Sequence, residues 1–367
     1  MNPRSLAILA ATTVVVVVLA IIAVSSGTDS TSGGGGDVAF PKLQNKLDQV
    51  AEITVVNRDA KIVVAKKGER WVLPEKHDYP AQVDKVRGLL LGFEEMKLIE
   101  RKTAKSDRFA RLNVDDPTGK EARAVRVTLK DASGGVLADV IVGKKKYDLS
   151  RTGIAGTYVR DADSEQAWLG SSEVDPGRTD RLWLARKLMD VKKKRIHRYS
   201  IKHADGEELV ASRKSPIEDN FMLETLPEGK RIKNKSVADN TATTLAFLEF
   251  DDVRPAADVA FPAPVAQNEF ITFDGLIVRV DIGEIEGEKW VRFSVTAGEA
   301  IPIPEEPAVK RDQKKDTLVP KEEKLPPVAE QVGTINSVVT GWLFKLPEFA
   351  NKNLTARNAQ MLAGPQS

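Results

Sequence analysis

The chain of 367 residues contains no cysteine. That absence excludes a disulfide framework, a thiol nucleophile, a thiolate metal site and a lipid-modified cysteine. The fold must therefore be held by its apolar core, and a chain of this length can bury enough apolar surface for that. The 55 basic and 53 acidic residues leave a net charge of +2. We expect no nucleic-acid partner, because no overall field attracts a polyanion.

Histidine is scarce, with only His77, His197 and His203 in the chain. No His-Glu-x-x-His sequence occurs, so a common helical zinc motif is missing. His197 and His203 flank an expected strand, which would separate them by about 20 Å, too far to share a metal. We expect all three histidines on the surface or in turns.

Other motifs with a known chemistry are also missing. Asp161, Asp163 and Glu165 mimic the start of a calcium loop, but Gln166 stands where that loop needs glycine and Ser172 where it needs glutamate. No Gly-x-Ser-x-Gly elbow and no complete phosphate loop occur. The sequence therefore predicts no catalytic residue, no metal site and no cofactor, although a hydrolase site between two domains stays open as a lesser alternative.

One long apolar run stands at the start, from Leu6 to Val24, and it contains nineteen residues without a charge. As a helix it would span about 28 Å, close to the thickness of a bilayer core. A cleaved signal peptide is the alternative, with Ala23-Val24-Ser25 as its cleavage site, but its apolar region is usually shorter. We expect an uncleaved membrane anchor, represented by Leu6, Val14, Val18, Ile22 and Val24.

The charges around this run predict an orientation. Arg4 precedes it, and the first charge after it is Asp29. By the positive-inside rule the N-terminus stays in the cytoplasm and the rest crosses the membrane. We expect a single-pass protein of the bacterial inner membrane with a periplasmic main domain, in contact with the phospholipid bilayer.

The first half of the remaining chain predicts strands, a helix and more strands. Residues 53–56 and 61–65 are β-branched and enclose a polar break, which is typical of a hairpin. Apolar residues from Val83 to Met96 repeat at helical spacing. Residues 124–129 and 136–142 form a second hairpin around Gly134 and Gly135. This order is typical of an antiparallel sheet covered by a helix.

The same order recurs in the second half. Residues 198–202 and 208–212 repeat the first hairpin, and Phe221-Met-Leu223 repeats Trp71-Val-Leu73. Trp342-Leu-Phe344 corresponds to the strand Tyr158-Val-Arg160. We therefore expect an α+β fold in which an N-terminal transmembrane helix precedes two tandem copies of an antiparallel sheet-plus-helix domain.

The resulting prediction assigns every part of the chain. The expected parts are a cytoplasmic tip and transmembrane anchor at 1–25, a Gly/Ser-rich tether at 26–39, a first α+β repeat at 40–175, a connecting helix at 176–195, a second repeat at 196–350 with a charged, proline-rich insertion at 301–330, and a C-terminal tail at 351–367.

The strongest basic run is Lys192, Lys193, Lys194 and Arg195. One interpretation is contact with anionic phospholipid headgroups. The other is a solvated loop at the C-terminal end of the expected connecting helix, where cations favour the helix dipole. The second interpretation is the simpler one, so these residues are only weak candidates for membrane-surface contacts.

Several segments resemble a bacterial family. They are Trp71-Val-Leu followed by Tyr79-Pro-Ala, then Trp183-Leu before Leu188-Met-Asp-Val191, then Phe273-Asp-Gly275 and Trp342-Leu-Phe-Lys-Leu-Pro347. In these the chain resembles the domain-of-unknown-function family 4340. The resemblance implies a membrane-anchored, outward-facing protein that assists an ABC-type export system of the gliding-motility kind. It implies no catalytic residue.

Two functions are expected from these observations. The first is a non-enzymatic accessory or scaffold component of an ABC-type transport system, with a permease-type membrane protein as its partner. The alternative is a cell-envelope module that binds glycan or lipid. The oligomeric state stays open.

Overall fold

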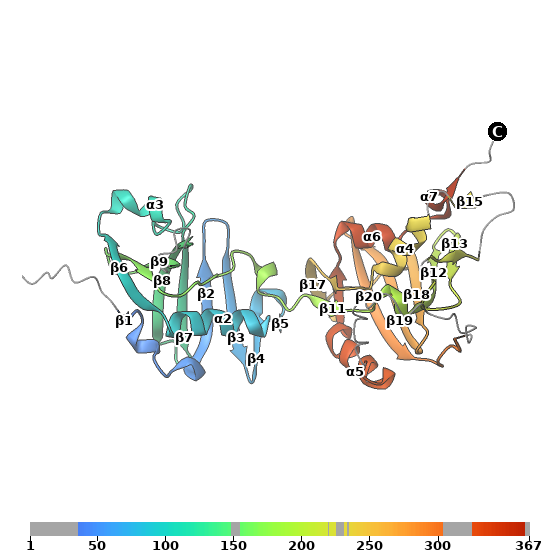
Figure 1. The fold of residues 1–367 in the computed structure, drawn as a ribbon, viewed down its shortest axis with the longest axis horizontal. Helices are drawn as coiled ribbons and strands as arrows, with labels where there is room; N and C mark the ends of the chain where they lie inside the picture. The colour runs from blue at the N-terminus through green and yellow to red at the C-terminus, as the bar shows by residue number, and fades with distance from the viewer. Residues whose placement is uncertain are drawn as a thin grey trace, which may run out of the picture. The chain divides into compact units, whose positions relative to one another are not determined.

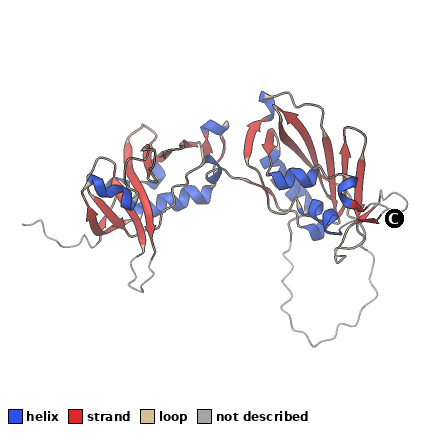
Figure 2. Ribbon diagram, turned by 90° about the horizontal axis from the view of Figure 1, so that it is seen from above, coloured by secondary structure: helices blue, strands red, loops and turns tan. Residues whose placement is uncertain are grey.

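The computed structural model describes residues 36–147, 155–218, 220–224, 231–232, 235–303 and 325–363. They divide into two compact units. The first comprises the described residues up to Leu73 together with Ala81–Trp183, and the second comprises Pro74–Pro80 together with the described residues from Leu184 onward. Strands predominate in both, and each unit is built on one large antiparallel sheet (Figures 1 and 2).

In the first unit the strands lie side by side in the order β1-β6-β10-β9-β8-β7-β2-β3-β4. The two predicted hairpins are confirmed, because β2 pairs with β3 and β7 pairs with β8, both antiparallel. The bounds are β1 Asp37–Val38, β2 Val50–Val56, β3 Lys61–Lys67, β4 Arg70–Leu73, β6 Lys97–Thr103, β7 Val125–Asp131, β8 Val136–Lys146, β9 Gly156–Asp161 and β10 Ala167–Gly170.

The helix predicted from Val83 onward is confirmed as α2, Val83–Glu94. Its buried residues Val86, Leu89, Leu90 and Phe93 recur every three or four positions, which gives the helix one apolar face. α2 lies across one face of the sheet, and the short α3 (Phe109–Leu112) lies near the ends of β6 and β9 (Figure 1).

The second unit has the strand order β14-β13-β12-β18-β19-β20-β21-β17, with two small sheets, β11-β16 and β15-β22. The bounds are β5 Tyr79–Pro80, β11 Lys187–Met189, β12 Ile196–His203, β13 Glu208–Ser212, β14 Met222–Leu223, β15 Arg231–Ile232, β16 Leu248–Glu249, β17 Asp252–Pro255, β18 Ala266–Thr272, β19 Leu276–Ile285, β20 Glu288–Ala297, β21 Trp342–Lys345 and β22 Leu362–Ala363. Its helices are α4 Lys235–Thr243, α5 Val328–Val339, α6 Glu348–Leu354 and α7 Asn358–Met361.

An aromatic cluster in the second unit is completed by residue 79, far from the rest in sequence. Tyr79 is 2% exposed. Its ring meets Phe250 and Trp342 edge-on, with centroids 5.2 and 4.9 Å away, and Phe344 at 6.1 Å. The segment Pro74–Pro80 therefore contributes Tyr79 to the core of the second unit.

The two large sheets have the same internal order. Reading β4-β3-β2-β7-β8-β9-β10-β6 in the first unit and β14-β13-β12-β18-β19-β20-β21-β17 in the second gives matching positions for these eight strands, whereas β1 has no counterpart. β14, which contains Met222 and Leu223, matches β4. The counterpart of the Trp342 strand is β10 rather than β9, so the predicted match to Tyr158-Val-Arg160 is wrong by one strand.

The expected fold class needs correction. The described residues are mainly antiparallel strands, and no helix among them has both the length and the apolar character to cross a membrane. Their longest helices, α2 and α5, have 12 residues each, which is about 18 Å of helix against a bilayer core of about 30 Å. The expected anchor residues, Leu6 to Val24, lie outside the described residues.

The predictions of a transmembrane helix, a single-pass topology and an inner-membrane location are corrected on the same finding. The tether expected at residues 26–39 falls mostly outside the described part of the chain. So does most of the insertion expected at residues 301–330, although α5 begins within it.

The expected connecting helix at 176–195 is also wrong. This segment contains a short 3₁₀ turn at Asp180–Leu182, the strand β11 and a second 3₁₀ turn at Lys193–Arg195. The apolar residues of this segment have helical spacing, but they are buried in the cores of different units. Trp183 is fully buried in the first unit, whereas Met189 of β11 lies in the second unit and pairs with Leu248 of β16. Tertiary packing decides the local structure here.

Candidate functional site

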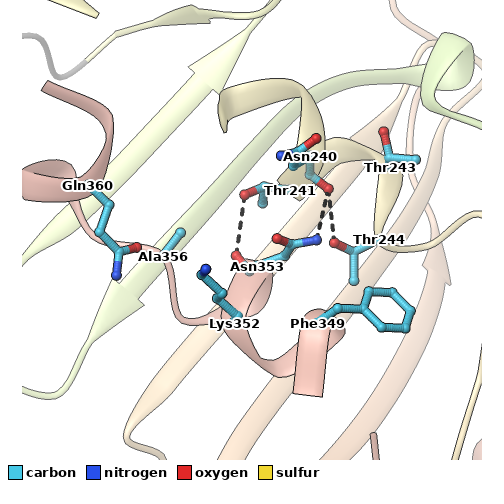
Figure 3. A pocket seen from close by; sticks show the side chains of 9 residues that line it. All are labelled: Asn240, Thr241, Thr243, Thr244, Phe349, Lys352, Asn353, Ala356 and Gln360. Carbon is cyan, nitrogen blue, oxygen red and sulfur yellow. Dashed lines mark hydrogen bonds between the residues drawn. The ribbon is translucent and has the colours of Figure 1, made fainter. Parts of the chain in front are cut away.

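A groove in the second unit lies between α4 and the chain from α6 to α7, and it has a volume of about 730 Å³ (Figure 3). Short polar side chains line one side, and a mixed set lines the other. The lining residues are Asn240, Thr241, Thr243, Thr244, Phe349, Lys352, Asn353, Ala356 and Gln360.

The sequence of α4 explains its wall. Ala238, Ala242 and Leu245 are fully buried at helical spacing and hold the helix against the unit. Asn240 and Thr243 face outward and are exposed. Small and polar residues therefore occupy the groove side of α4, so the opposite wall can approach closely.

Hydrogen bonds tie the two walls together. The Thr241 hydroxyl donates to the backbone carbonyl of Asn353 at 3.3 Å, and the Asn353 amide donates to the carbonyl of Asn240 at 3.2 Å (Figure 3). The Thr244 hydroxyl also donates to Asn240, at 3.1 Å. These groups are committed to the fold: each threonine proton goes to a carbonyl oxygen, which does not act as a general base.

The rim of the groove offers two different kinds of contact. The Phe349 side chain is 64% exposed, at the start of α6. Lys352 and Gln360 are exposed as well. In Figure 3 the Phe349 ring and the Lys352 amine point to opposite sides of α6, so the groove offers an apolar contact and a charged contact at separate points.

The α6–α7 wall is fastened to the turn between β12 and β13. The Arg357 guanidinium pairs with the carboxylates of Asp205 at 2.7 Å and Glu207 at 2.5 Å. Glu207 also accepts from the Asn358 backbone N–H at 2.8 Å. His203, which is 4% exposed, places its Nε2 3.1 Å from the carbonyl of Ala356. These contacts fix the position of the corner between the two helices.

These contacts move the pKa values of the charged partners. The pKa of Asp205 is lowered by the backbone N–H of Glu207 and by Arg357. Burial acts to raise the pKa of Glu207, but the Asn358 N–H and Arg357 outweigh it and the net pKa is lowered. The pKa of Arg357 is raised by the same carboxylates. All three groups therefore stay charged at neutral pH.

The basic run at 192–195 does not form one surface. Lys193 lies 3.2 Å from Asp239 of α4. Arg195 is mostly buried and donates to Asp274 at 2.7 Å and to Gln331 at 2.9 Å. Lys194 is exposed. Lys192 lies 2.9 Å from Asp190. The run is divided between internal ion pairs and the surface, and the sequence alone could not separate these roles.

The histidines have three different surroundings. His77 lies in an exposed turn, 3.5 Å from Asp258. His197 places its Nδ1 2.8 Å from the carbonyl of Arg213. His203 is buried at the groove wall, so the expectation that all three lie on the surface or in turns is wrong for this one. The burial of His203 could not be predicted from the sequence, because the charged turn that follows it suggests exposure.

The acidic turn at 161–166 is closed by a neighbouring arginine. Arg160 donates to the carbonyl of Ser164 at 2.8 Å and to that of Val114 at 3.0 Å. The Asp161 side chain accepts from the Asp163 N–H at 3.0 Å. The Asp161 carboxylate thus stabilises the turn. Within the described ranges, no three His, Asp or Glu side chains gather in a way that could hold a metal ion.

Sequence reasoning missed the groove. Thr241 and Thr244 were visible as members of a helix, but the hydrogen bond from the Thr241 hydroxyl to the carbonyl of Asn353, 112 positions away, was not. The signal that was available is the run Thr241-Ala-Thr-Thr244, which is unusually polar for the buried side of a helix.

Taken together, these features define a protein of two sheet units with a groove, lined largely by polar side chains, in the second unit. The chain belongs to the family described as a domain of unknown function (DUF4340), whose model matches residues 71–269. The match includes α4 but not α6 and α7, which form the other wall. No curated protein and no solved structure matches the chain.

Proposed function

We propose that this protein is a non-enzymatic accessory or scaffold module that binds a protein partner through the groove between α4 and α6–α7. The exposed ring of Phe349 at the rim is the observation that carries the proposal. An exposed aromatic beside a groove is typical of an interface anchor, since burying such a ring supplies much of the binding free energy.

The chemistry of the groove supports a polypeptide rather than a glycan. A glycan is held by many free hydrogen-bonding groups. In this groove the hydroxyls of Thr241 and Thr244 and the side-chain amide of Asn353 already donate to backbone carbonyls of the protein. Phe349 and Lys352 contribute apolar and cationic contacts instead. A peptide segment that carries both an apolar residue and a carboxylate fits these two contacts.

The identity of the partner is a second part of the proposal. The resemblance to the DUF4340 family implied assistance to an ABC-type export system, and membership of that family is established over residues 71–269. We infer that the partner is a permease-type subunit of such a system.

Affinity purification of the full chain tests this proposal. We expect a permease and its ATPase to be retained in fixed ratio by the native protein and lost from the double variant Phe349→Ala, Lys352→Glu. Met222→Ala is the matched control, because Met222 is 69% exposed but lies outside the groove. The proposal would be refuted if the groove variant still retained the permease and ATPase, or if the native chain were recovered without any transport subunit.

The glycan alternative has one supporting observation: Phe349 and amide side chains line the same groove. Titration with soluble cell-wall fragments distinguishes it. Binding that Phe349→Ala abolishes would favour the glycan module, whereas the leading proposal predicts no binding.

A further inference from the structure

Phe247 is displayed on the surface in an unfavourable backbone conformation. It follows α4 in the chain, is 66% exposed, and has φ of +49°. Its neighbours Leu245 and Leu248 are buried. Among the described non-glycine residues with positive φ, the others are Asn, Asp, His or Glu, so Phe247 is the one apolar side chain in this group. Positive φ is disfavoured for a bulky residue.

The surrounding chain holds this conformation in place. The Phe247 backbone N–H donates to the Asp190 carboxylate at 3.0 Å, and the Val191 N–H donates to the carbonyl of Leu245 at 2.9 Å. The turn is thus fastened to the segment of β11. Strain that the structure maintains in this way is characteristic of functional positions, because an unused turn would be expected to carry Gly or Asn.

Lysines surround the exposed ring. The Lys192 ammonium lies 3.3 Å from the ring centroid of Phe247, and the Lys187 ammonium lies 5.8 Å from it. Lys187 is exposed, while Lys192 also pairs with Asp190. The aromatic tip, defined as Phe247 with Lys187 and Lys192, therefore joins a rigidly presented apolar group to positive charge.

We propose that the aromatic tip is a second interaction surface, which docks into an apolar pocket rimmed by carboxylates on a partner protein. A lipid surface fits less well, because the Lys192 ammonium lies against the ring and would lose its hydration with it in hydrocarbon. In a protein interface, carboxylates pair with Lys187 and Lys192 while the ring fills a pocket. This surface is independent of the groove proposed above.

Crosslinking tests the partner class. For this experiment the full chain is produced in its own cells with the photoreactive residue benzoyl-phenylalanine incorporated at position 247. Mass spectrometry then identifies the molecule to which this residue becomes crosslinked. The same probe at Ile217, which is also 66% exposed, is the control. The expected product is a partner peptide rich in Asp and Glu, specific to position 247 and lost with Lys187→Glu. Attachment to lipid, to a second copy of the chain, or to nothing would overturn the proposal.

A second measurement separates docking from folding. Carbodiimide joins Lys187 to a partner carboxylate without a spacer, and the variant Phe247→Asn keeps a residue that tolerates positive φ. We expect Phe247→Asn to lose this crosslink while its Tm stays unchanged or rises. A lowered Tm would assign the ring to the fold and overturn the proposal. The groove variant Phe349→Ala keeps the crosslink, so failure of one surface is distinguishable from failure of the other.

Discussion

The substitution Tyr79→Ala tests the assignment of Pro74–Pro80 to the second unit. Tyr79 is 2% exposed and contacts the rings of Phe250, Trp342 and Phe344. Removing a buried ring to alanine typically costs about 3–5 kcal/mol, which includes the lost transfer free energy and the cavity that remains. Three edge contacts place this site toward the upper part of that range.

Hydrogen exchange read by mass spectrometry is the assay, because it reports on each unit separately. We expect faster exchange in peptides of β17, β20 and β21, which surround the aromatic cluster, and no change in β7 and β8 of the first unit. Tyr79→Phe is the matched control, since it keeps the ring and should cost less than about 1.5 kcal/mol. A loss below about 1 kcal/mol for Tyr79→Ala, or an equal loss of protection in the first unit, would refute the assignment.

The remaining predictions concern one turn and one ion-pair network. Gly275→Ala should lower the free energy of unfolding by more than about 1–2 kcal/mol, because φ at Gly275 is +91° and a Cβ would lie 2.6 Å from the carbonyl oxygen of Gly298. Gly206 is the control, since its φ is +89° but a Cβ there would have no atom within 4 Å. Urea denaturation should show a smaller loss for Gly206→Ala, and equal losses would contradict the packing argument. Arg357→Ala should speed exchange in α7 at neutral pH. The pKa values of Asp205 and Glu207 are lowered in the folded protein, so their stabilising contribution is present at neutral pH and is lost as the pH falls below about 4, their usual range. The urea midpoints of native and Arg357→Ala proteins should therefore converge on acidification, and a constant difference would contradict this interpretation.

Much of the sheet could be predicted because its strands carry strong local signals. The hairpin of β2 and β3 follows from β-branched residues on either side of a polar break, and Asn57 in that break uses its side chain to close the turn. α2 follows from its apolar periodicity. In these elements local preference and tertiary packing agree, so the sequence pattern is sufficient.

Prediction failed where tertiary packing opposed or replaced the local signal. β6 has the sequence Lys-Leu-Ile-Glu-Arg-Lys-Thr, which shows no alternation, and its residues are half-buried or exposed. Its pairing with β10 on one side and β1 on the other makes it a strand. The segment around Trp183 has helical spacing, but its apolar residues are buried in different units. Neither outcome is encoded within a short window of sequence.

The groove was not predicted from the sequence, and the basic run was predicted in composition but not in position. The basic run was visible, yet Arg195 turned out to be held by Asp274 and Gln331, which are distant in sequence. The exposure of Phe349 depends on how α6 docks on α4, and that of Phe247 on a backbone angle. Such features require three-dimensional information.

We propose that the groove between α4 and α6–α7 binds a protein partner. Hydrogen exchange of the complex recovered by affinity purification, compared with the isolated chain, tests it most directly. If the groove is the binding site, exchange at residues 238–246 and 349–356 is slower in the complex, while β7 and β8 are unchanged and serve as an internal reference. Unchanged exchange along both groove walls, with protection appearing elsewhere in the second unit, would contradict it.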